Sequence, residues 1–351
     1  LTAEQTMDVL NPFNQQAIGQ VSCADNSHVT LAVSAAKKAF EKNRHQASCQ
    51  RAKVLRGAAN LMAERIDEFA ATIAAETGKP ITAAHKEVTR CINTINLSAE
   101  EATRLTGETV KFDSFEGGEN RIGYYEHVPL GVIAAITPFN DPLNLAAHKL
   151  GPALAAGNSV ILKPSQQAPL SAIKLVEVLL ESGLPEGQVN VLTGYARDFA
   201  QALVSHKDVA MVTYTGGEVS GEIIAKNAGI KKLAMELGAN SPVIVMDDCN
   251  LTNAVEACVS GSYRAVGQNC IGVQRIYVQD GIYDDFKNEF AKQTQTLKVG
   301  DQFKSDTDVG PMINEGEAKR IESWVKQALS AGANLLAGGK RVGACYYPTA
   351  L

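Results

Sequence analysis

Two residues of this sequence could do covalent chemistry together: Cys270, in Gly267-Gln268-Asn269-Cys270, and Glu236, in Met235-Glu236-Leu237-Gly238. A free cysteine thiol has a pKa of about 8.5, so a reactive cysteine needs a base or a positive field to ionise near neutral pH. A carboxylate on a neighbouring loop can act as that base. Most intracellular cysteines are buried packing residues, so this pair alone does not establish a site. Whether Cys270 and Glu236 form a catalytic pair depends on the helices and strands that position them.

The composition narrows the class of protein. A chain of 351 residues predicts two or three structural units. With 45% hydrophobic residues, 20% charged residues and a net charge of −5, it predicts a globular protein without a nucleic-acid surface. The longest apolar runs have the length of strands, so no membrane span is expected. Seven cysteines without a CxxC or Cys/His spacing argue against a disulfide framework and against a metal site. Since no signal-peptide pattern opens the sequence, we expect a reducing, cytoplasmic setting.

The first part of the chain predicts packing elements. After a short extended lead, Asp25 can cap a helix, and further amphipathic helical patterns cover residues 51–76 and 81–105. Residues 121–127 alternate in polarity and carry Tyr124-Tyr125. This pattern predicts an exposed hairpin, which suits a surface ribbon and an arm that pairs with another subunit about equally well.

From residue 131 the pattern becomes strand, turn and helix, repeated. The predicted strands are 132–136, 159–162, 189–192, 211–214 and 232–235. Short strands separated by helices predict a parallel sheet covered on both faces, with the ligand outside the carboxyl ends of the strands. A second α/β series begins after Gly238, with strands at 243–246 and 275–278 and helices at 251–262, 283–296 and 315–332.

Three segments whose residues could bind a ligand or take part in a reaction lie at the ends of these strands. They are Thr137-Pro138-Phe139-Asn140, Lys163-Pro164-Ser165-Gln166 and Thr215-Gly216-Gly217. Glycines before a helix allow a phosphate to approach free backbone N–H groups, although glycine also makes ordinary turns. Lys163 could hold a ribose hydroxyl or a phosphate, or could be a solvated lysine. Asn140 could stabilise an oxyanion, or could be part of a turn. No GxGxxG fingerprint is present.

Taken together, these segments resemble the aldehyde dehydrogenase superfamily, in family order and along essentially the whole chain. The blocks are Pro129-Leu130-Gly131-Val132-Ile133, Thr137-Pro138-Phe139-Asn140, Lys149-Leu150-Gly151-Pro152-Ala153-Leu154-Ala155-Ala156-Gly157-Asn158, Lys163-Pro164-Ser165, Tyr214-Thr215-Gly216, Met235-Glu236-Leu237-Gly238, Gly267-Gln268-Asn269-Cys270 and Asp308-Val309-Gly310-Pro311. The resemblance implies an α/β fold with a Rossmann-like parallel-sheet NAD(P)-binding domain over residues 1–112 and 132–238. It further implies a β-ribbon oligomerisation arm over 113–131 and a second α/β catalytic domain over 239–351.

The resemblance also implies roles for individual residues. Cys270 would be the nucleophile and Glu236 the general base, while Asn140 and the backbone N–H of Cys270 would form the oxyanion hole. Lys149 would support the active site. Lys163 would contact the adenosine ribose, the helix after Gly216 would take the pyrophosphate, and Gly194 would lie near the adenine. The predicted cofactor-binding residues are Thr137, Pro138, Phe139, Lys163, Ser165, Gln166, Gly194, Thr215, Gly216, Gly217, Leu237 and Gly238.

This sequence departs from the family pattern in three respects. Gln166 stands where NAD-preferring members usually carry a glutamate that grips both ribose hydroxyls. A neutral amide does not repel a 2′-phosphate, so the expected cofactor is NAD or NADP. Gly217 stands where a serine commonly helps to hold the pyrophosphate. Family members also continue to a Glu-x-Phe-Gly-Pro segment and a C-terminal oligomerisation strand, so we expect the printed sequence to be a piece of a longer protein.

The substrate prediction rests on residues 140–149, which are similar to the branch acting on lactaldehyde, phosphonoacetaldehyde and related short aldehydes. In that reading His148, Arg121 and Asn269 are candidate contacts for an anionic or hydroxylated substrate end, although His148 could equally be a satisfied helix histidine. We predict a homodimer or homotetramer that oxidises a small polar aldehyde to its acid through a Cys270 thiohemiacetal and thioester, with Glu236 as the base for hydrolysis.

Two alternatives remain open. One is a dicarboxylate semialdehyde dehydrogenase, which should have a second cationic residue near the mouth of the pocket. The other is a truncated nucleotide-binding protein without turnover. A CoA-acylating enzyme is disfavoured because Glu236 can activate water.

Overall fold

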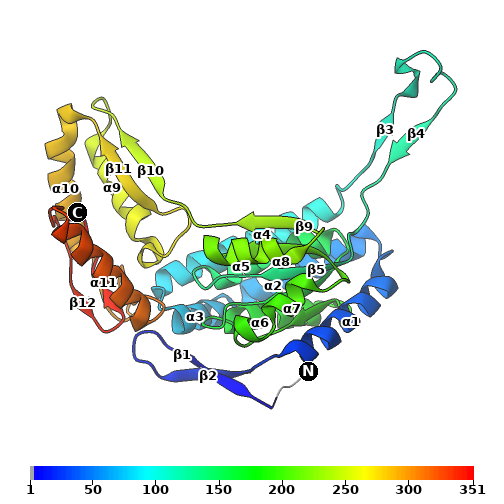
Figure 1. Ribbon diagram of the computed structural model, residues 1–351, viewed down its shortest axis with the longest axis horizontal. Coiled ribbons are helices and arrows are strands. Elements are labelled where there is room, and N and C mark those ends of the chain that lie inside the picture. The colour runs from blue at the N-terminus through cyan, green and yellow to red at the C-terminus, as the bar shows by residue number, and fades with distance from the viewer. Residues whose placement is uncertain (1–3) are drawn as a thin grey trace.

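A five-stranded parallel sheet forms the centre of the computed structural model, which describes residues 4–351 (Figure 1). The strand order is β7 (Val189–Val191), β6 (Ser159–Lys163), β5 (Val132–Ile136), β8 (Val209–Thr215) and β9 (Lys232–Glu236), with every neighbouring pair parallel. All five residues of β5 are buried, as expected for a central strand covered on both faces. This arrangement confirms the predicted α/β fold class.

Helices cover both faces of the sheet. Five pack on one face: α2 (Ser48–Glu64), α3 (Ile66–Thr77), α4 (Ile81–Ala102), α5 (Pro142–Ala155) and α6 (Leu170–Glu181). The other face carries α1 (Asn26–Asn43), α7 (Ala196–Ser205) and α8 (Glu218–Ala228). Alternation along β5 divides the two cores, since Ile133 and Ala135 join the first and Val132, Ala134 and Ile136 the second.

One predicted helix is wrong. Residues 51–76 were expected to form a single helix, but the helix breaks at Arg65, whose φ of −114° and ψ of 26° end α2 and begin α3. The Arg65 guanidinium forms two hydrogen bonds to the Glu181 carboxylate of α6, at 2.6 and 2.9 Å. The break between α2 and α3 therefore coincides with a contact to a residue far away in the sequence. The spacing of apolar residues alone could not reveal such a break.

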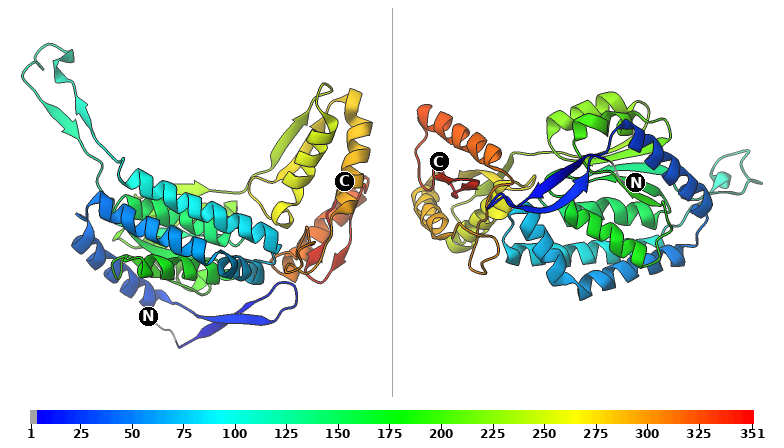
Figure 2. Two further views of the ribbon diagram at one scale, coloured as in Figure 1. Left: turned by 180° about the vertical axis from the view of Figure 1, so that it is seen from behind. Right: turned by 90° about the horizontal axis from the view of Figure 1, so that it is seen from below.

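Two antiparallel hairpins lie outside the central sheet. β1 (Thr6–Leu10) pairs with β2 (Ala17–Ser22), and β3 (Glu108–Val110) pairs with β4 (Gly123–Tyr125). The β3–β4 arm, with the 3-10 turn η1 (Phe112–Ser114), extends far from the body (Figures 1 and 2). The predicted start of the arm at residue 113 needs correction, because its first strand lies before that position. All three residues of β3 are exposed, so no apolar alternation marked the strand.

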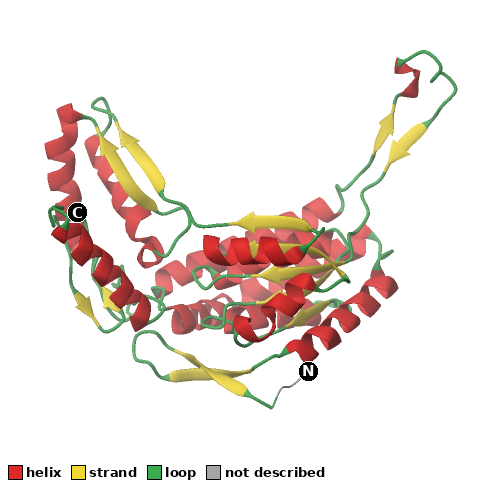
Figure 3. Cartoon of the chain, viewed as in Figure 1, coloured by secondary structure: helices red, strands yellow, loops and turns green. Residues whose placement is uncertain are grey.

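A second α/β unit follows β9. It contains the parallel pair β10 (Ser241–Val245) and β11 (Val273–Val278), the helices α9 (Leu251–Tyr263), α10 (Tyr283–Thr296) and α11 (Glu315–Ser330), and the hairpin β12 (Arg341–Val342) and β13 (Cys345–Tyr346). Two short turns connect these elements: η2 (Arg264–Gly267), whose inner residues are not helical, and the 3-10 turn η3 (Asp280–Ile282). The unit stands to one side of the sheet body (Figure 3) and has its own apolar core.

Close contacts join this unit to the rest of the chain. A Cβ atom on Gly310 would lie 1.9 Å from the Gly78 carbonyl oxygen, so the two backbones meet with no room for a side chain. Gln302 is fully buried and donates a hydrogen bond of 3.0 Å to Asn11 beyond the end of β1. Among the helices described, none is both long and apolar enough to cross a membrane.

Candidate active site

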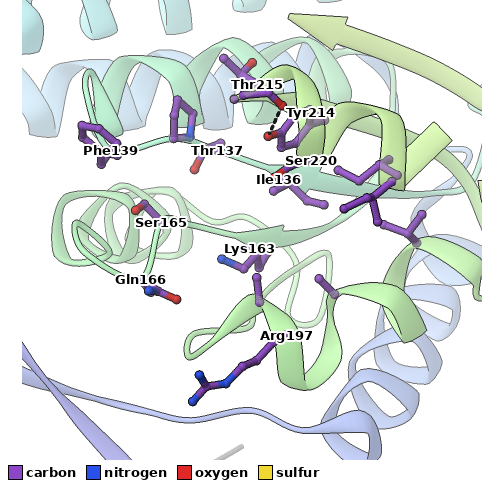
Figure 4. A pocket seen from close by; sticks show the side chains of 18 of the residues that line it. Ile136, Thr137, Phe139, Lys163, Ser165, Gln166, Arg197, Tyr214, Thr215 and Ser220 are labelled. Atoms are coloured by element: carbon purple, nitrogen blue, oxygen red, sulfur yellow. Dashed lines mark hydrogen bonds between the residues drawn. The ribbon is translucent and has the colours of Figure 1, made fainter. Parts of the chain in front are cut away.

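A cleft of about 540 Å³ opens at the carboxyl ends of β5, β6 and β8, where a parallel sheet of this kind binds its ligand. Figure 4 shows its lining side chains. It collects nine of the predicted cofactor residues: Thr137, Pro138, Phe139, Lys163, Ser165, Gln166, Thr215, Gly216 and Gly217. They come from three strand ends that are far apart in the sequence, so the fold brings them together.

The glycine segment at the start of α8 leaves room for a phosphate. Gly217 is the N-cap residue, no side chain caps the helix, and a Cβ atom at Gly217 would meet nothing within 4 Å. Tyr214 donates a hydrogen bond of 3.1 Å to the Gly217 carbonyl and so fixes the turn. Uncapped N–H groups and the positive end of the helix dipole suit a pyrophosphate.

Two polar side chains of the cleft, Thr137 and Lys163, have hydrogen-bonding capacity that the protein itself does not use up. Thr137 Oγ1 is buried and has no hydrogen-bond partner among residues 4–351. Lys163 is only 5% exposed, its ammonium donates to the Pro164 carbonyl at 3.0 Å, and burial lowers its pKa to about 8. Because an unpartnered buried hydroxyl is costly, these groups fit a bound nucleotide sugar.

The sequence reading missed Arg197, which also lines the cleft. This residue lies in the first turn of α7, its guanidinium is 4.8 Å from the centre of the Tyr195 ring, and its side chain is 79% exposed. Figure 4 places it on the same side of the cleft as Lys163 and Gln166. The sequence offered one indication of this role: Arg197 follows β7 at the start of a helix, and the loop after a parallel strand lies at the same sheet edge as the cleft.

Three predicted cofactor residues do not line this cleft. Gly194 has a φ of +111° and lies so close to Cys23 and Ala24 that a Cβ atom would come within 3.0 Å of both, which gives it a packing role. Leu237 packs over Gly221 of α8, and Gly238 lies in the loop beyond β9. The structure therefore does not bring Gly194, Leu237 and Gly238 to the lining of this cleft, and their roles as cofactor contacts stay predictions.

The predicted oxyanion residue and the cysteine loop do meet. Asn140 Nδ2 donates a hydrogen bond of 2.9 Å to the carbonyl of Gln268, although the two residues are 128 positions apart. Cys270 is partly buried, and its Sγ lies 3.8 Å from Asn269 Oδ1. Asn140 therefore contacts the segment that carries the thiol.

The backbone immediately before this segment is strained. Ala265, Val266 and Gly267 have φ values of 50°, 57° and 73°, all in the left-handed region. For a β-branched residue such as valine this conformation is rare, and each such residue costs on the order of 1–3 kcal/mol. The cysteine thus follows a segment whose conformation the surrounding fold must impose.

The remaining predicted catalytic residues lie along α5 and at the end of β9. Lys149 donates a hydrogen bond of 3.0 Å to Thr213 of β8. Burial lowers its pKa to about 8, while the Glu236 carboxylate acts in the opposite direction. The pKa of His148 is lowered by burial and by Arg90 and Lys149, whereas Asp141 and Glu236 oppose the shift. Glu236 therefore acts electrostatically on this face of α5.

Arg121 does not belong to this group. It lies in the exposed β3–β4 arm, whose turn extends away from the sheet body. The structure therefore does not bring Arg121 together with the other candidate residues, and its role as a substrate contact stays a prediction. Within the described part of the chain, no cluster of three or more histidine, cysteine or acidic residues could hold a metal ion.

Comparison with known proteins gives a consistent result. The family model described as "Aldehyde dehydrogenase family" matches residues 1–351. Aspartate-semialdehyde dehydrogenase 1 of Pseudomonas canavaninivorans is 51% identical, over 99% of this chain and 74% of its own length. The 3-sulfolactaldehyde dehydrogenase of Priestia megaterium is 46% identical, over 100% of this chain and 73% of its own. The crystal structure of glyceraldehyde-3-phosphate dehydrogenase GapN from Methanocaldococcus jannaschii, complexed with NADP, superposes with a TM-score of 0.94 at 36% identity, covering 98% of this chain and 75% of that one.

Proposed function

The chain belongs to the aldehyde dehydrogenase family, and we propose on that premise that it oxidises a small polar aldehyde to the carboxylic acid with NAD or NADP. One observation carries the proposal: the Asn140 amide and the segment that bears Cys270 meet through a hydrogen bond of 2.9 Å, across 128 positions of sequence. This contact holds an amide donor against the loop that carries the thiol, and attack of sulfur on a carbonyl requires such a donor near the nucleophile.

The cleft at the strand ends would hold the dinucleotide. The N-terminus of α8 at Gly217 would receive the pyrophosphate, and Lys163 and Thr137 would bind ribose hydroxyls. When bound, the nicotinamide supplies a hydride acceptor. The orphaned Thr137 hydroxyl and the open space at Gly217 support this fit.

The protein's own groups would act in two stages. The Cys270 thiolate attacks the aldehyde carbon, and Asn140 Nδ2 with the Cys270 backbone N–H stabilises the alkoxide that develops on the former carbonyl oxygen. Loss of a hydride from this tetrahedral adduct leaves a thioester on sulfur. Glu236 then takes a proton from water, which attacks the acyl carbon and releases the acid and the free thiolate. A thioester suits this sequence because a thiolate is a good nucleophile and a good leaving group.

We propose a separate role for each part of the chain. We assign cofactor binding to residues 1–107 and 132–238, which leaves β3 in the arm, and the nucleophile to the unit at 239–351. The arm is assigned to contacts between subunits of a homodimer or homotetramer, supported by its exposed apolar residues. All seven cysteines are free thiols, which supports a reducing, cytoplasmic setting.

Replacement of the nucleophile tests this proposal. Cys270→Ala should abolish formation of reduced cofactor with a panel of short aldehydes, while binding of the reduced dinucleotide persists. Cys49→Ala, at an exposed cysteine of α2, is the matched control and should retain turnover. Equal rates in the two variants would contradict the role of Cys270. Dinucleotide binding without turnover in the unaltered protein would favour a binding function instead.

A narrower class of candidate substrate is an aldehyde that carries an anionic group at the end opposite the carbonyl. The Nη2 atoms of Arg90 and Arg264 lie 2.7 and 3.8 Å from Asp141 Oδ2, directly after Asn140. Both arginines line a cleft of about 810 Å³ between α4 and α9, and Arg90 Nε is buried without a partner among the described residues. Two arginines around a single carboxylate leave positive charge for a carboxylate, sulfonate or phosphate. The relatives named for aspartate semialdehyde and 3-sulfolactaldehyde support this class of substrate.

Comparison of charged and neutral substrates tests this narrower candidate. Arg264→Met should lower kcat/KM for succinate semialdehyde by about 10-fold or more, since a charge-assisted hydrogen bond is worth roughly 1.5–3 kcal/mol. The value for butanal, which lacks the carboxylate, should change little. A similar loss for both aldehydes would rule out anion recognition by this residue.

A further inference from the structure

The helix that follows Asn140 begins without a local cap. Asp141 is the N-cap residue of α5, yet its side chain accepts no hydrogen bond from the first turn. Glu87 of α4 replaces it: Glu87 Oε1 accepts the backbone N–H of Leu143 at 3.0 Å and that of Asn144 at 3.2 Å. Glu87 is completely buried. A carboxylate from another helix thus supplies the missing cap and fixes where α5 starts.

A single buried lysine connects this cap to the N-cap residue. The Lys79 ammonium forms ion pairs with both Glu87 and Asp141, and Lys79 is only 6% exposed. The second oxygen of Asp141 accepts a hydrogen bond from Arg90 at 2.7 Å. Burial raises the pKa of Glu87 and Lys79 opposes that shift, while Lys79 and Arg90 together hold the pKa of Asp141 below its usual value. Each carboxylate therefore has a fixed cationic partner.

Asn140 lies between this network and the cysteine loop. Its Oδ1 accepts the backbone N–H of Asp141 at 3.0 Å, and its Nδ2 donates to the Gln268 carbonyl at 2.9 Å. A displacement of Asp141 is therefore transmitted to both ends of the Asn140 amide. In a water-excluded site, misplacement of a catalytic group by about 1 Å can cost roughly 100-fold in rate.

We propose that Glu87, Lys79 and Asp141 form a positioning network that holds the Asn140 amide at the place where the oxyanion develops. The inference rests on the proposed function, because it acts through the role assigned to Asn140. Neither Glu87 nor Lys79 lines the cleft at the strand ends or the cleft between α4 and α9. They act by fixing the start of α5 and the residue that follows the amide.

A double-mutant cycle with Asn140 tests the network in the cofactor-loaded enzyme. Glu87→Gln keeps an oxygen that can accept N–H groups and removes the charge that binds Lys79. It should lower kcat by roughly 10- to 100-fold, with the KM for cofactor and the rate of Cys270 alkylation nearly unchanged. In an Asn140→Ala background the same substitution should cause almost no further loss of kcat, because the group it positions is absent.

The matched control is Glu76→Gln. Glu76 is also a completely buried glutamate that caps a helix from a distance, since it accepts the backbone N–H groups of Leu170 and Ser171 in α6. Its substitution should reduce stability, and the loss of kcat it causes should be the same with and without Asn140. If Glu87→Gln fails to fold, Asp141→Asn, which keeps the shape of a partly exposed side chain, enters the same cycle.

The possible outcomes separate the two ideas. Losses of kcat that multiply in Glu87→Gln/Asn140→Ala, or full kcat in Glu87→Gln, would overturn the positioning network. The proposed function would survive both results. Full kcat in Asn140→Ala, or turnover in Cys270→Ala, would instead overturn the proposed function itself.

Discussion

At the scale of single residues, two side chains of the cleft bear on the choice between NAD and NADP. Gln166 presents a neutral amide beside Lys163, and Arg197 adds an exposed guanidinium to the same part of the cleft (Figure 4). The 2′-phosphate of NADP is an anion that a guanidinium binds through charge-assisted hydrogen bonds, and a carboxylate at position 166 would repel it. The balance of charge therefore favours NADP.

Arg197→Ala should weaken binding of NADPH by about 10-fold or more while NADH binding changes little, since a lost charge-assisted hydrogen bond costs roughly 1.5–3 kcal/mol. Gln166→Glu should act in the same direction. Titration of each variant with both dinucleotides by fluorescence measures the two dissociation constants. Arg56→Ala, at an exposed arginine of α2 outside the cleft, is the control. Equal weakening of both dinucleotides in Arg197→Ala would contradict this role.

The sequence could predict some of these residues for a definite reason. Thr137, Lys163 and Thr215 stand at strand ends, and parallel strands bring their carboxyl ends to one edge. Glu87 could not be found this way, because its role depends on α4 packing against the start of α5. Arg197 was missed for a similar reason, since nothing in a single helix pattern indicates which cleft its first turn faces.

At the scale of elements, the start of α6 depends on the buried carboxylate of Glu76. Burial raises the pKa of Glu76 to about 7, although the N–H groups of Leu170 and Ser171 favour its charged form. A carboxyl whose pKa is higher in the folded state than in the unfolded state contributes stability at low pH. That contribution is lost as the pH rises from about 4.5 through about 7.

Glu76→Gln should remove this pH dependence. Between about pH 5 and about pH 8 the unaltered protein should lose up to roughly 3 kcal/mol of stability relative to the variant, because one pKa unit corresponds to about 1.4 kcal/mol. Urea unfolding at the two pH values measures the difference. Glu64→Gln, at an exposed glutamate of α2, should follow the unaltered protein. A difference of the opposite sign would show that the carboxyl is ionised in the native state throughout this range.

Element boundaries show where sequence patterns stop being informative. The helix α10 covers residues 283–296 as expected, because its apolar residues Phe286 and Phe290 recur at helical spacing and face the core. The break at Arg65 was not expected, since its partner Glu181 lies on another helix. The strand β3 was not expected either, because all its residues are exposed and its sequence therefore shows no alternation of apolar and polar residues.

At the scale of the whole molecule, the β3–β4 arm presents apolar surface without covering it. Ile122 is 95% exposed, and Tyr124 and Val128 are 72% and 75% exposed. A projecting ribbon with such residues is typical of contacts between subunits. The arm therefore favours an assembly in which another copy covers these side chains.

Ile122→Lys should weaken that assembly by about 10- to 100-fold, because burial of one isoleucine contributes roughly 1.5–3 kcal/mol. Sedimentation velocity over a range of protein concentrations measures the association constant. Ile230→Lys is the matched control, since Ile230 is also fully exposed and lies in the loop before β9. Unchanged association in Ile122→Lys would exclude this part of the arm from the interface.

The hydrogen bond between Gln302 and Asn11 spans 291 positions of the chain. During synthesis Asn11 leaves the ribosome long before Gln302 is added, and the strands of the parallel sheet, β5 to β9, have all been synthesised once residue 236 is added. The nucleotide cleft can therefore assemble on the nascent chain ahead of this contact. The contact between Gln302 and Asn11 can form only after translation has passed residue 302, whereas Thr193 can bind Ser22 and Ala24 at the end of β2 well before that point.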